Sequence, residues 1–398
     1  MDAPFFDTLR GFKVTSRKHR IADDDFVDRF NHYHTSIMIC VLSIIICAKQ
    51  YIVGQPLQCW IPVEFKEGWE KYAENYCWVK NTYYIPRADE LPDTPDERAR
   101  YEIRYYQWVP FVLGLQALLF NVPKFFWQLL NWQSGIHIKS LMQTANDPGN
   151  ISADKREESL ELLCRYVTNS IFYTKEARNS IAVTIKRMIF KVVCCGNSQA
   201  GSYLLTTYMV MKILYLLNLI CQFMIMNAFL GTSFDLFGLE LLKRLSQGLT
   251  WESTAHFPRV TFCDFRIRSL GHVRPYTLQC VLVINMFNEK VYIFLWFWFA
   301  ILFLATALNL LKWLSWILFA RRRRKIIKRV LKTDITVTRN DINAFMDDLK
   351  TDGMFVLKMI SLNAGDLLTN DLIKKLFYKY QTDKSEGRPT LWDAPEKS

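Results

Sequence analysis

The sequence lacks the short motifs on which enzymatic and metal chemistry usually depend. It has no phosphate-binding GxxxxGK[ST] loop, no GxSxG nucleophile motif, no HExxH zinc motif and no CxxC pair. His32 and His34 stand two residues apart without further ligands at metal-binding spacing. A segment that begins at Asp348 resembles a calcium loop, but Lys350 and Met359 occupy positions that need oxygen ligands. We therefore expect no enzyme activity, no cofactor and no metal site.

Acidic residues are absent from four long apolar runs, and each run contains a single lysine. About 20 apolar residues suffice to cross a bilayer, and tryptophans gather near the run ends, as they do at membrane interfaces. The buried helices of a soluble core are typically shorter than these runs. No small-residue cleavage site follows the first run, which indicates a retained span and not a signal peptide. We predict four transmembrane helices, at residues 35–53, 108–132, 204–230 and 291–320.

Basic residues are unevenly distributed among the segments outside these spans. The five segments are residues 1–34, 54–107, 133–203, 231–290 and 321–398. The first, third and fifth hold 32 lysines and arginines, whereas the second and fourth hold 14. Eight basic residues follow the fourth span directly in RRRRKIIKRVLK, Arg321 to Lys332, where the positive-inside bias acts most strongly. We expect both termini and the middle loop to be cytoplasmic and the other two loops to be extracellular.

The basic run after the fourth span has two other possible partners, nucleic acid and anionic lipid. Its position next to a span favours a topology anchor in contact with membrane lipids, without a nucleic-acid partner. In this orientation Lys124, Lys212 and Lys312 lie in the cytoplasmic parts of their spans, and Lys49 lies near the outer end of the first. We expect each to extend its ammonium group to a head-group layer, and a place on an ion pathway is the alternative.

Four of the ten cysteines fall in the predicted extracellular loops. Cys59 and Cys77 belong to the first loop, and Cys263 and Cys280 belong to the second. An even number of cysteines in an oxidising compartment indicates disulfides. Zinc ligands are usually two to four residues apart, whereas 17 and 16 residues separate these cysteines. Four cysteines allow three pairings, and the residues alone do not choose among them.

A predicted helix in the first extracellular loop carries a row of acidic residues. Glu64, Glu67, Glu70 and Glu74 recur at intervals of three or four after Pro62, so they share one helix face. One interpretation is a water-filled mouth that favours cations, with Glu64 and Glu67 as pore-lining candidates. The other is an ordinary solvated helix face.

The middle loop and the tail contain helical stretches: DKREESLELLCRYV and SIAVTIKRMIFKVV (residues 180–193) in the loop, and NDINAFMDDLKTDG, GMFVLKMISLNAG and NDLIKKLFYKY in the tail. The three stretches in the tail are opened or closed by Asn, Asp or Gly. We expect these stretches to pack into a helical cytoplasmic domain. The predicted fold is a mainly α membrane protein: a four-transmembrane-helix subunit with a small disulfide-linked extracellular domain and a helical cytoplasmic domain.

Specific strings in the chain resemble those of the innexins, the gap-junction proteins of invertebrates. The string YYQWVP at the entrance of the second span matches the family signature; its residues are Tyr105, Tyr106, Gln107, Trp108, Val109 and Pro110. DDDFVDRFNHYHT, PLQCW, HFPRVTFCDF, EKVYIFLWFWF and DGMFVLKMISLNAG also match, so the resemblance covers nearly the whole chain. Connexins carry three cysteines per outer loop, and pannexins lack the YYQWV string.

The resemblance implies a ring of eight identical or related subunits around a pore in the plasma membrane. Two rings on apposed cells would dock through their outer loops and form a gap-junction channel, a passive conduit for ions and small metabolites. The resemblance also implies the nested disulfides Cys59–Cys280 and Cys77–Cys263.

The resemblance further implies that the segment MDAPFFDTLRGF folds into the pore as a funnel. Asp2 would face the permeating ions, and Phe5 and Phe6 would pack the funnel against the first span. A narrow ion filter usually needs rings of charges or carbonyls, which spans without acidic residues do not supply. An undocked plasma-membrane hemichannel and an adhesion or scaffold protein remain alternatives, and the absence of N-x-S/T sequons from both outer loops favours docking.

Overall fold

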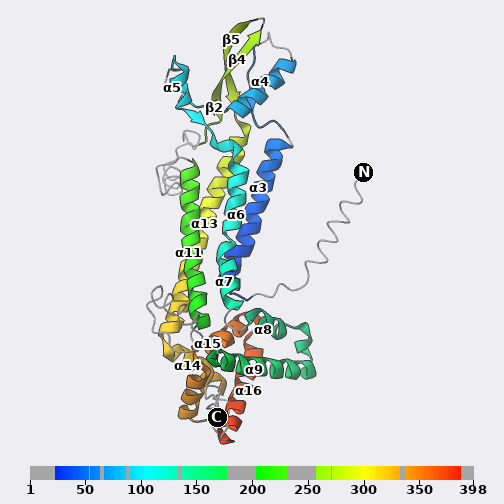
Figure 1. Ribbon diagram of the computed structural model, residues 1–398, viewed down its shortest axis with the longest axis vertical. Helices are drawn as coiled ribbons and strands as arrows, with labels where there is room; N and C mark the ends of the chain where they lie inside the picture. The colour runs from blue at the N-terminus through cyan, green and yellow to red at the C-terminus, as the bar shows by residue number, and fades with distance from the viewer. Residues whose placement is uncertain are drawn as a thin grey trace, which may run out of the picture. The chain divides into compact units, whose positions relative to one another are not determined.

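Four helical segments of the computed structural model are long and apolar enough to cross a membrane (Figure 1). They are Phe26–Tyr51, Val109–Asn131, Tyr203–Leu230 and Val283–Leu318. The structure describes residues 23–52, 54–62, 67–86, 90–132, 137–176, 203–230, 257–269, 271–331 and 337–386. Only 22 to 39% of the most apolar window of each segment is buried within the single chain, so most of each apolar surface is free to face lipid or other subunits.

The first span begins at Phe26, well before the predicted residue 35. It consists of α2 (Phe26–Arg29), the π-helix η1 (Phe30–Thr35) and α3 (Ser36–Tyr51). Asp25 caps its N-terminus, because its Oδ1 accepts hydrogen bonds from the backbone amides of Val27 at 2.8 Å and Asp28 at 3.3 Å. The polar string before the apolar run is therefore already helical.

The second span is interrupted between α6 (Val109–Leu119) and α7 (Val122–Trp132). Pro123 has no backbone N–H, and its ring clashes with the preceding helical turn, so a break before it is expected. Asn121 lies at the break and donates to Ser36 Oγ at 2.8 Å and to the Ala117 carbonyl at 3.0 Å. The third and fourth spans are the single helices α11 (Tyr203–Leu230) and α13 (Val283–Leu318).

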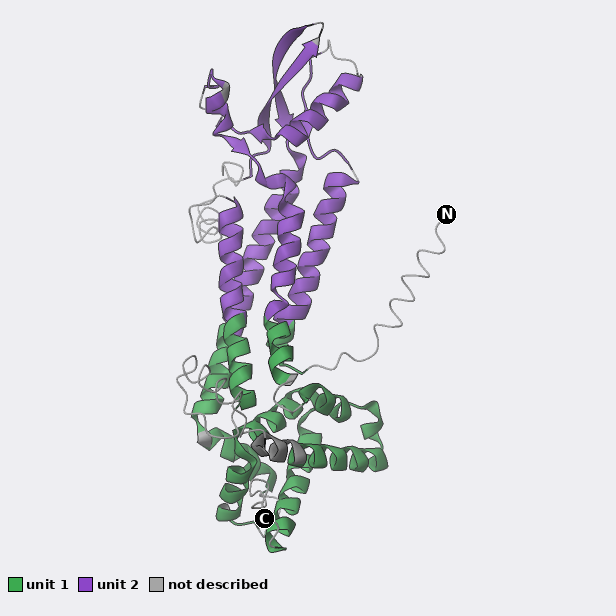
Figure 2. Cartoon of the chain, viewed as in Figure 1, with its two compact units in different colours: residues 1–29, 123–214, 307–398 green, residues 30–122, 215–306 purple. Residues whose placement is uncertain are grey.

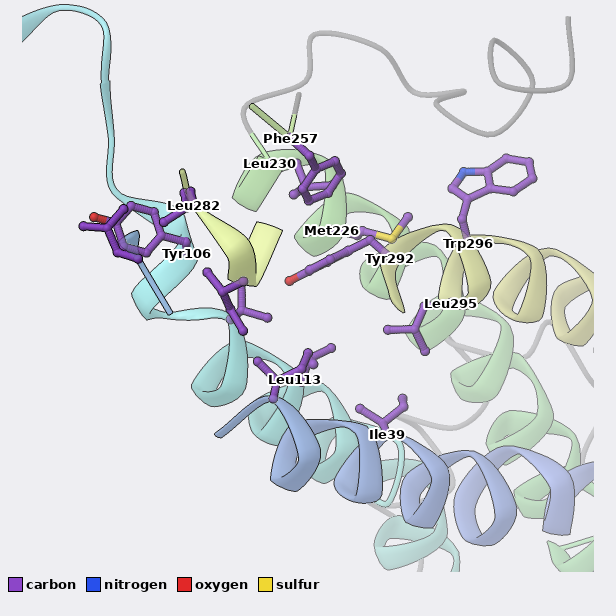
Figure 3. Packing of buried hydrophobic residues seen from close by; sticks show 14 of the residues in the cluster. Ile39, Tyr106, Leu113, Met226, Leu230, Phe257, Leu282, Tyr292, Leu295 and Trp296 are labelled. Atoms are coloured by element: carbon purple, nitrogen blue, oxygen red, sulfur yellow. The ribbon is translucent and has the colours of Figure 1, made fainter. Parts of the chain in front are cut away.

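The chain divides into two compact units (Figure 2). Unit 1 comprises Met1–Arg29, Pro123–Leu214 and Ala307–Ser398, and unit 2 comprises Phe30–Val122 and Tyr215–Thr306. The core of unit 2 is formed by buried side chains from all four spans, among them Ile39, Leu113, Met226 and Leu295 (Figure 3). These contacts hold the span segments of unit 2 together by apolar burial.

Unit 2 also contains a five-stranded antiparallel sheet in the order β1-β5-β4-β2-β3. Its strands are β1 (Gln58–Cys59), β2 (Thr82–Tyr83), β3 (Glu102–Ile103), β4 (Val260–Ser269) and β5 (His272–Val281). β4 and β5 form a hairpin whose turn includes Gly271 at φ +84°, a conformation that favours glycine. The helices α4 (Glu67–Lys80) and α5 (Pro95–Ala99) complete this part of the chain. The sheet is an addition to the predicted elements.

Unit 1 contains the predicted helical domain. Its helices beyond the spans are α8 (Ile138–Ala145), the 3-10 helix η3 (Pro148–Ile151), α9 (Ala153–Glu176), α14 (Ala320–Leu331), α15 (Arg339–Ala364) and α16 (Asp366–Ser385). Two predicted tail helices join in α15, which is kinked at Lys350, where φ is +54°. Phe345 of α15 packs edge-on against Phe377 of α16, with ring centroids 5.4 Å apart. The predicted stretch at residues 180–193 lies outside the described residues.

Candidate functional site

Two disulfides connect the two predicted extracellular loops. Cys59 of β1 pairs directly with Cys280 of β5 in the sheet register, and their Sγ atoms are bonded. Cys77 of α4 is bonded to Cys263 of β4. The prediction of disulfides between outer-loop cysteines is confirmed, and these two pairs are the ones that the resemblance implies. Each bond closes a loop of well over a hundred residues, which stabilises the fold mainly by restricting the unfolded chain. In the folded chain the two bonds fix the sheet and α4 to each other.

Asp264 adds a polar connection between the same two loops. Its carboxylate accepts hydrogen bonds from Tyr83 Oη at 3.0 Å, from Thr277 Oγ1 at 3.0 Å and from Arg98 Nη1 at 3.1 Å. Arg98 and Asp264 are about four-fifths buried, so their ion pair is less screened than one at the surface. Burial and the adjacent Asp264 carboxylate raise the pKa of Tyr83. Sequence reasoning missed this network because its members are far apart in the chain.

The acidic row of the first loop does not share one solvated face. Glu70 is exposed, but Glu74 is buried with Ala73 and Cys77 on the inner side of α4. The Glu74 carboxylate accepts a hydrogen bond from the Cys59 backbone N–H at 3.4 Å, and burial raises its pKa. The expectation is therefore wrong for Glu74, because the Cys77–Cys263 disulfide turns this face of α4 toward the sheet. Glu64 and the side chain of Glu67 lie outside the described residues.

The signature Tyr105 to Pro110 forms the connection from the sheet to the second span. Tyr105, Tyr106 and Gln107 make the 3-10 turn η2 (Tyr105–Gln107), and Val109 and Pro110 are the first two residues of α6, where proline is well tolerated. Trp108 between them is exposed.

Tyr106 and Gln107 anchor this turn to both sides of the connection. Tyr106 is completely buried, and its backbone carbonyl accepts a hydrogen bond from Gln50 Nε2 at 2.7 Å. Gln107 Nε2 donates to the carbonyl of Trp78 at the end of α4 and to Asn81 Oδ1. The turn therefore links the first span, the second span and the disulfide-linked helix α4.

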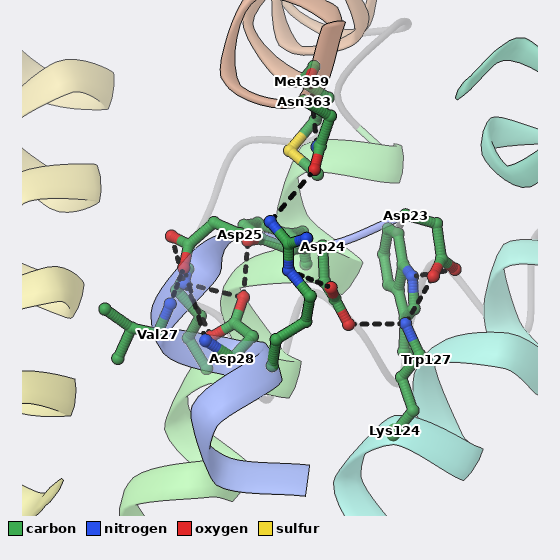
Figure 4. Close-up of polar contacts among 12 residues, drawn as sticks. Asp23, Asp24, Asp25, Val27, Asp28, Lys124, Trp127, Met359 and Asn363 are labelled. Carbon is green, nitrogen blue, oxygen red and sulfur yellow. Dashed lines mark hydrogen bonds and ion pairs between the residues drawn. The ribbon is translucent and has the colours of Figure 1, made fainter. Parts of the chain in front are cut away.

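A buried cluster of acidic and basic side chains lies at the start of the first span (Figure 4). Asp23 and Asp24 both accept hydrogen bonds from Lys124 Nζ of α7, and Trp127 Nε1 donates to Asp23 Oδ2 at 3.1 Å. Arg29 lies 3.8 Å from Asp24 and donates to Asn363 Oδ1 of α15 at 3.4 Å. The string DDDFVDR thus contacts the second span and the tail domain within unit 1.

Lys212 of α11 is the centre of the other half of this cluster. Its Nζ lies 3.0 Å from Asp25 Oδ2 and 2.9 Å from Asp28 Oδ1, and it also donates to Asn309 Oδ1 at 2.8 Å. Trp313 of α13 donates to Asp25 at 2.9 Å, and Tyr208 donates to Asp28 at 2.6 Å. Within unit 1 the cluster therefore joins residues of all four spans.

The expected snorkelling of Lys124 and Lys212 is wrong. Lys212 is only 1% exposed and Lys124 is largely buried, because the aspartates compensate their charges inside the protein. Burial, together with the nearby Asp23 and Asp28, raises the pKa of Asp24 to about 6 although Lys124 opposes the shift. Burial acts to raise the pKa of Asp25, but the Lys212 ammonium and the hydrogen bonds from Trp313 and Lys212 together outweigh it, and the pKa is lowered.

The residues predicted for the pore funnel, Asp2, Phe5 and Phe6, lie outside the described residues. Ten residues separate the segment MDAPFFDTLRGF from the cluster, which fixes the chain where the first span starts. The disulfide-linked sheet and the buried cluster are both structural devices, and in the described residues neither presents a nucleophile beside a base.

The chain matches the family model described as Innexin over residues 24–380. It is 41% identical over 371 residues to Innexin unc-9 of Caenorhabditis elegans, covering 92% of this chain and 94% of the relative. It is 36% identical to Innexin-19 of Caenorhabditis briggsae and 32% identical to Innexin eat-5 of Caenorhabditis elegans, each match covering 90% of this chain and 87% of the relative. The chain therefore belongs to the innexin family, multi-pass membrane proteins that form gap-junction channels.

Proposed function

We propose that eight copies of the chain form a ring around a wide pore, and that two rings on apposed cells dock through the disulfide-linked sheet. The observation that carries the proposal is the joining of both outer loops by two disulfides and the Asp264 network. Docking of two large rings needs a surface of fixed shape, because disorder at an interface costs binding free energy. A loop pair held at several points meets that need. Residues 1–34 and the tail face the cytoplasm in this arrangement.

The N-terminal segment is proposed to line the pore with Asp2 toward the permeating ions. The buried aspartate cluster supports this arrangement, since it holds the chain at the residues that follow the segment. Asp2→Asn removes one negative charge per subunit from the proposed funnel. We expect lower cation preference in paired-cell recordings, and unchanged permeation would remove Asp2 from the pore wall.

The docking proposal is tested by opening one crosslink in paired cells. The double variant Cys77→Ala, Cys263→Ala removes the second disulfide without leaving a free thiol, and Cys221→Ser, at an exposed free cysteine of α11, is the matched control. We expect junctional conductance to be lost in the double variant and kept in the control, with both proteins at the cell surface.

The same recordings distinguish the alternative functions. Junctional conductance in the unmodified protein supports a docked channel. Current across the membrane of single cells without coupling would indicate an undocked hemichannel. The absence of both would indicate an adhesion or scaffold protein. Rotational symmetry in images of purified particles would test the ring of eight.

A further inference from the structure

A cavity of about 430 Å³ lies within unit 1 among the end of α13, α14, α15 and α16. Its volume is within the ~300–1,000 Å³ range of small-molecule sites. Its walls combine an apolar floor, to which Trp316, Leu357 and Ile373 contribute, with a basic rim. A cavity that is apolar at the base and charged at the rim fits an amphiphilic ligand.

The rim carries positive charge that the described residues balance only in part. Arg329, Lys358 and Lys374 line the cavity, and none of them forms an ion pair with a carboxylate in the described part of the chain. Among the described lining residues Asp366 alone is acidic, and one of its oxygens already accepts a hydrogen bond from Ser361 Oγ at 2.6 Å. Burial and the neighbouring Lys312 ammonium lower the pKa of Lys358. An anion bound here would relieve this repulsion.

The position of the cavity in the fold indicates where such an anion comes from. Trp316 belongs to the last turn of α13, the fourth membrane span, and α14 follows almost immediately. Helix α14 begins at Ala320, carries Arg321 to Arg324 next, and places Ile327 and Val330 in the buried interior. A cluster of basic residues next to a span attracts the anionic head groups of the cytoplasmic leaflet. The cavity therefore lies beside the end of the fourth span that carries the basic run.

We propose that this cavity binds the phosphorylated headgroup of a polyanionic phospholipid of the cytoplasmic leaflet. The Arg329 guanidinium and the ammonium groups of Lys358 and Lys374 donate to phosphate oxygens, and charge-assisted hydrogen bonds of this kind are strong. The apolar floor contacts the beginning of the acyl chains. A zwitterionic headgroup would leave most of the rim charge uncompensated, so it binds weakly. The site requires the membrane topology but not docking, so its failure would leave the proposed channel function standing.

The test uses the full chain purified in detergent and titrated with short-chain dioctanoyl lipids, with bound lipid counted by native mass spectrometry. We expect phosphatidylinositol 4,5-bisphosphate to bind and phosphatidylcholine not to bind. The double variant Lys358→Gln, Lys374→Gln should weaken binding at least about tenfold. The matched control, Lys325→Gln, Lys328→Gln, removes the same charge from exposed positions of α14 outside the cavity and should change binding less than about threefold.

Three results would overturn the proposal. Equal losses in the two double variants would show that the basic run adsorbs anions without a site. Equal binding of phosphatidylcholine would remove the role of the headgroup charge. Binding of free inositol 1,4,5-trisphosphate as tightly as the lipid would assign the site to a soluble phosphate. An unchanged elution volume in size-exclusion chromatography and unchanged tryptophan emission establish that the variants are folded. Lys358→Arg should retain lipid binding because it keeps the positive charge.

Discussion

Replacing Lys212 with methionine tests whether the buried aspartate cluster holds the inner ends of the spans together. Methionine keeps the length of the side chain but removes the ammonium that lies 2.9 to 3.0 Å from Asp25 and Asp28. Both carboxylates are at least 94% buried and cannot recover their solvation from water. Removing one partner of a buried ion pair typically costs about 3–5 kcal/mol, because the remaining charge stays buried. We expect a loss of that size in the free energy of unfolding.

The control is the same change at Lys312, the single lysine of the predicted fourth span. Lys312 is exposed and forms no ion pair within the described residues, so Lys312→Met should change stability by less than about 0.5 kcal/mol. Adding Asp28→Asn to the Lys212 variant should restore at least about 1 kcal/mol, since it removes one uncompensated charge.

Unfolding is followed by tryptophan fluorescence of the detergent-solubilised protein as the mole fraction of a denaturing detergent increases. Trp127 and Trp313 both donate to the cluster aspartates and report on it directly. Equal midpoints for Lys212→Met and Lys312→Met would refute the reasoning.

Three further changes test other parts of the structure. Asp352 accepts from two backbone amides at the start of α11, and burial raises its pKa to about 6. Between about pH 4 and about pH 6 the folded protein therefore keeps the carboxyl proton of Asp352, whereas the unfolded chain has lost it. The contribution of Asp352 to the free energy of unfolding falls by about 3 kcal/mol as the pH rises through this range. Asp352→Asn should flatten that part of the stability–pH curve, and an unchanged slope would contradict the assignment. Gln107→Ala removes the hydrogen bond to the Trp78 carbonyl and should lower the free energy of unfolding, measured by thermal unfolding, by about 1–2 kcal/mol. An unchanged free energy of unfolding would show that Gln107 does not anchor the turn. Asp264→Asn weakens the pair with Arg98 and should cost about 1–3 kcal/mol in the same assay, and a neutral effect would show that the disulfides suffice.

The membrane character of the chain was readable from the residues because hydropathy acts along the chain. The four apolar runs overlap the four helical segments, and the third predicted span differs from α11 by one residue. Element boundaries were less accurate where polar residues continue a helix, as at Phe26, or where a proline divides it, as at Pro123. Both differences depend on local caps and backbone geometry, which average hydropathy does not represent.

The partners of charged residues were not readable in the same way. A lone lysine in an apolar run predicts snorkelling when the run is considered by itself. Lys212 and Asp25 are separated by 187 positions and meet only because α11 packs beside the start of the first span. Glu74 likewise belongs to a solvated face by periodicity, and a disulfide to another loop decides its burial.

The sequence by itself determined the four spans, the grouping of basic residues, the separation of four cysteines into two loops and the resemblance to the innexins. These properties follow from composition and short strings, which do not depend on distant contacts. The tertiary structure alone decided the five-stranded sheet, the aspartate–lysine cluster and the basic cavity between α13, α14, α15 and α16. Each is made from segments far apart in the chain, and burial changes the energy of a charge only when those segments have come together.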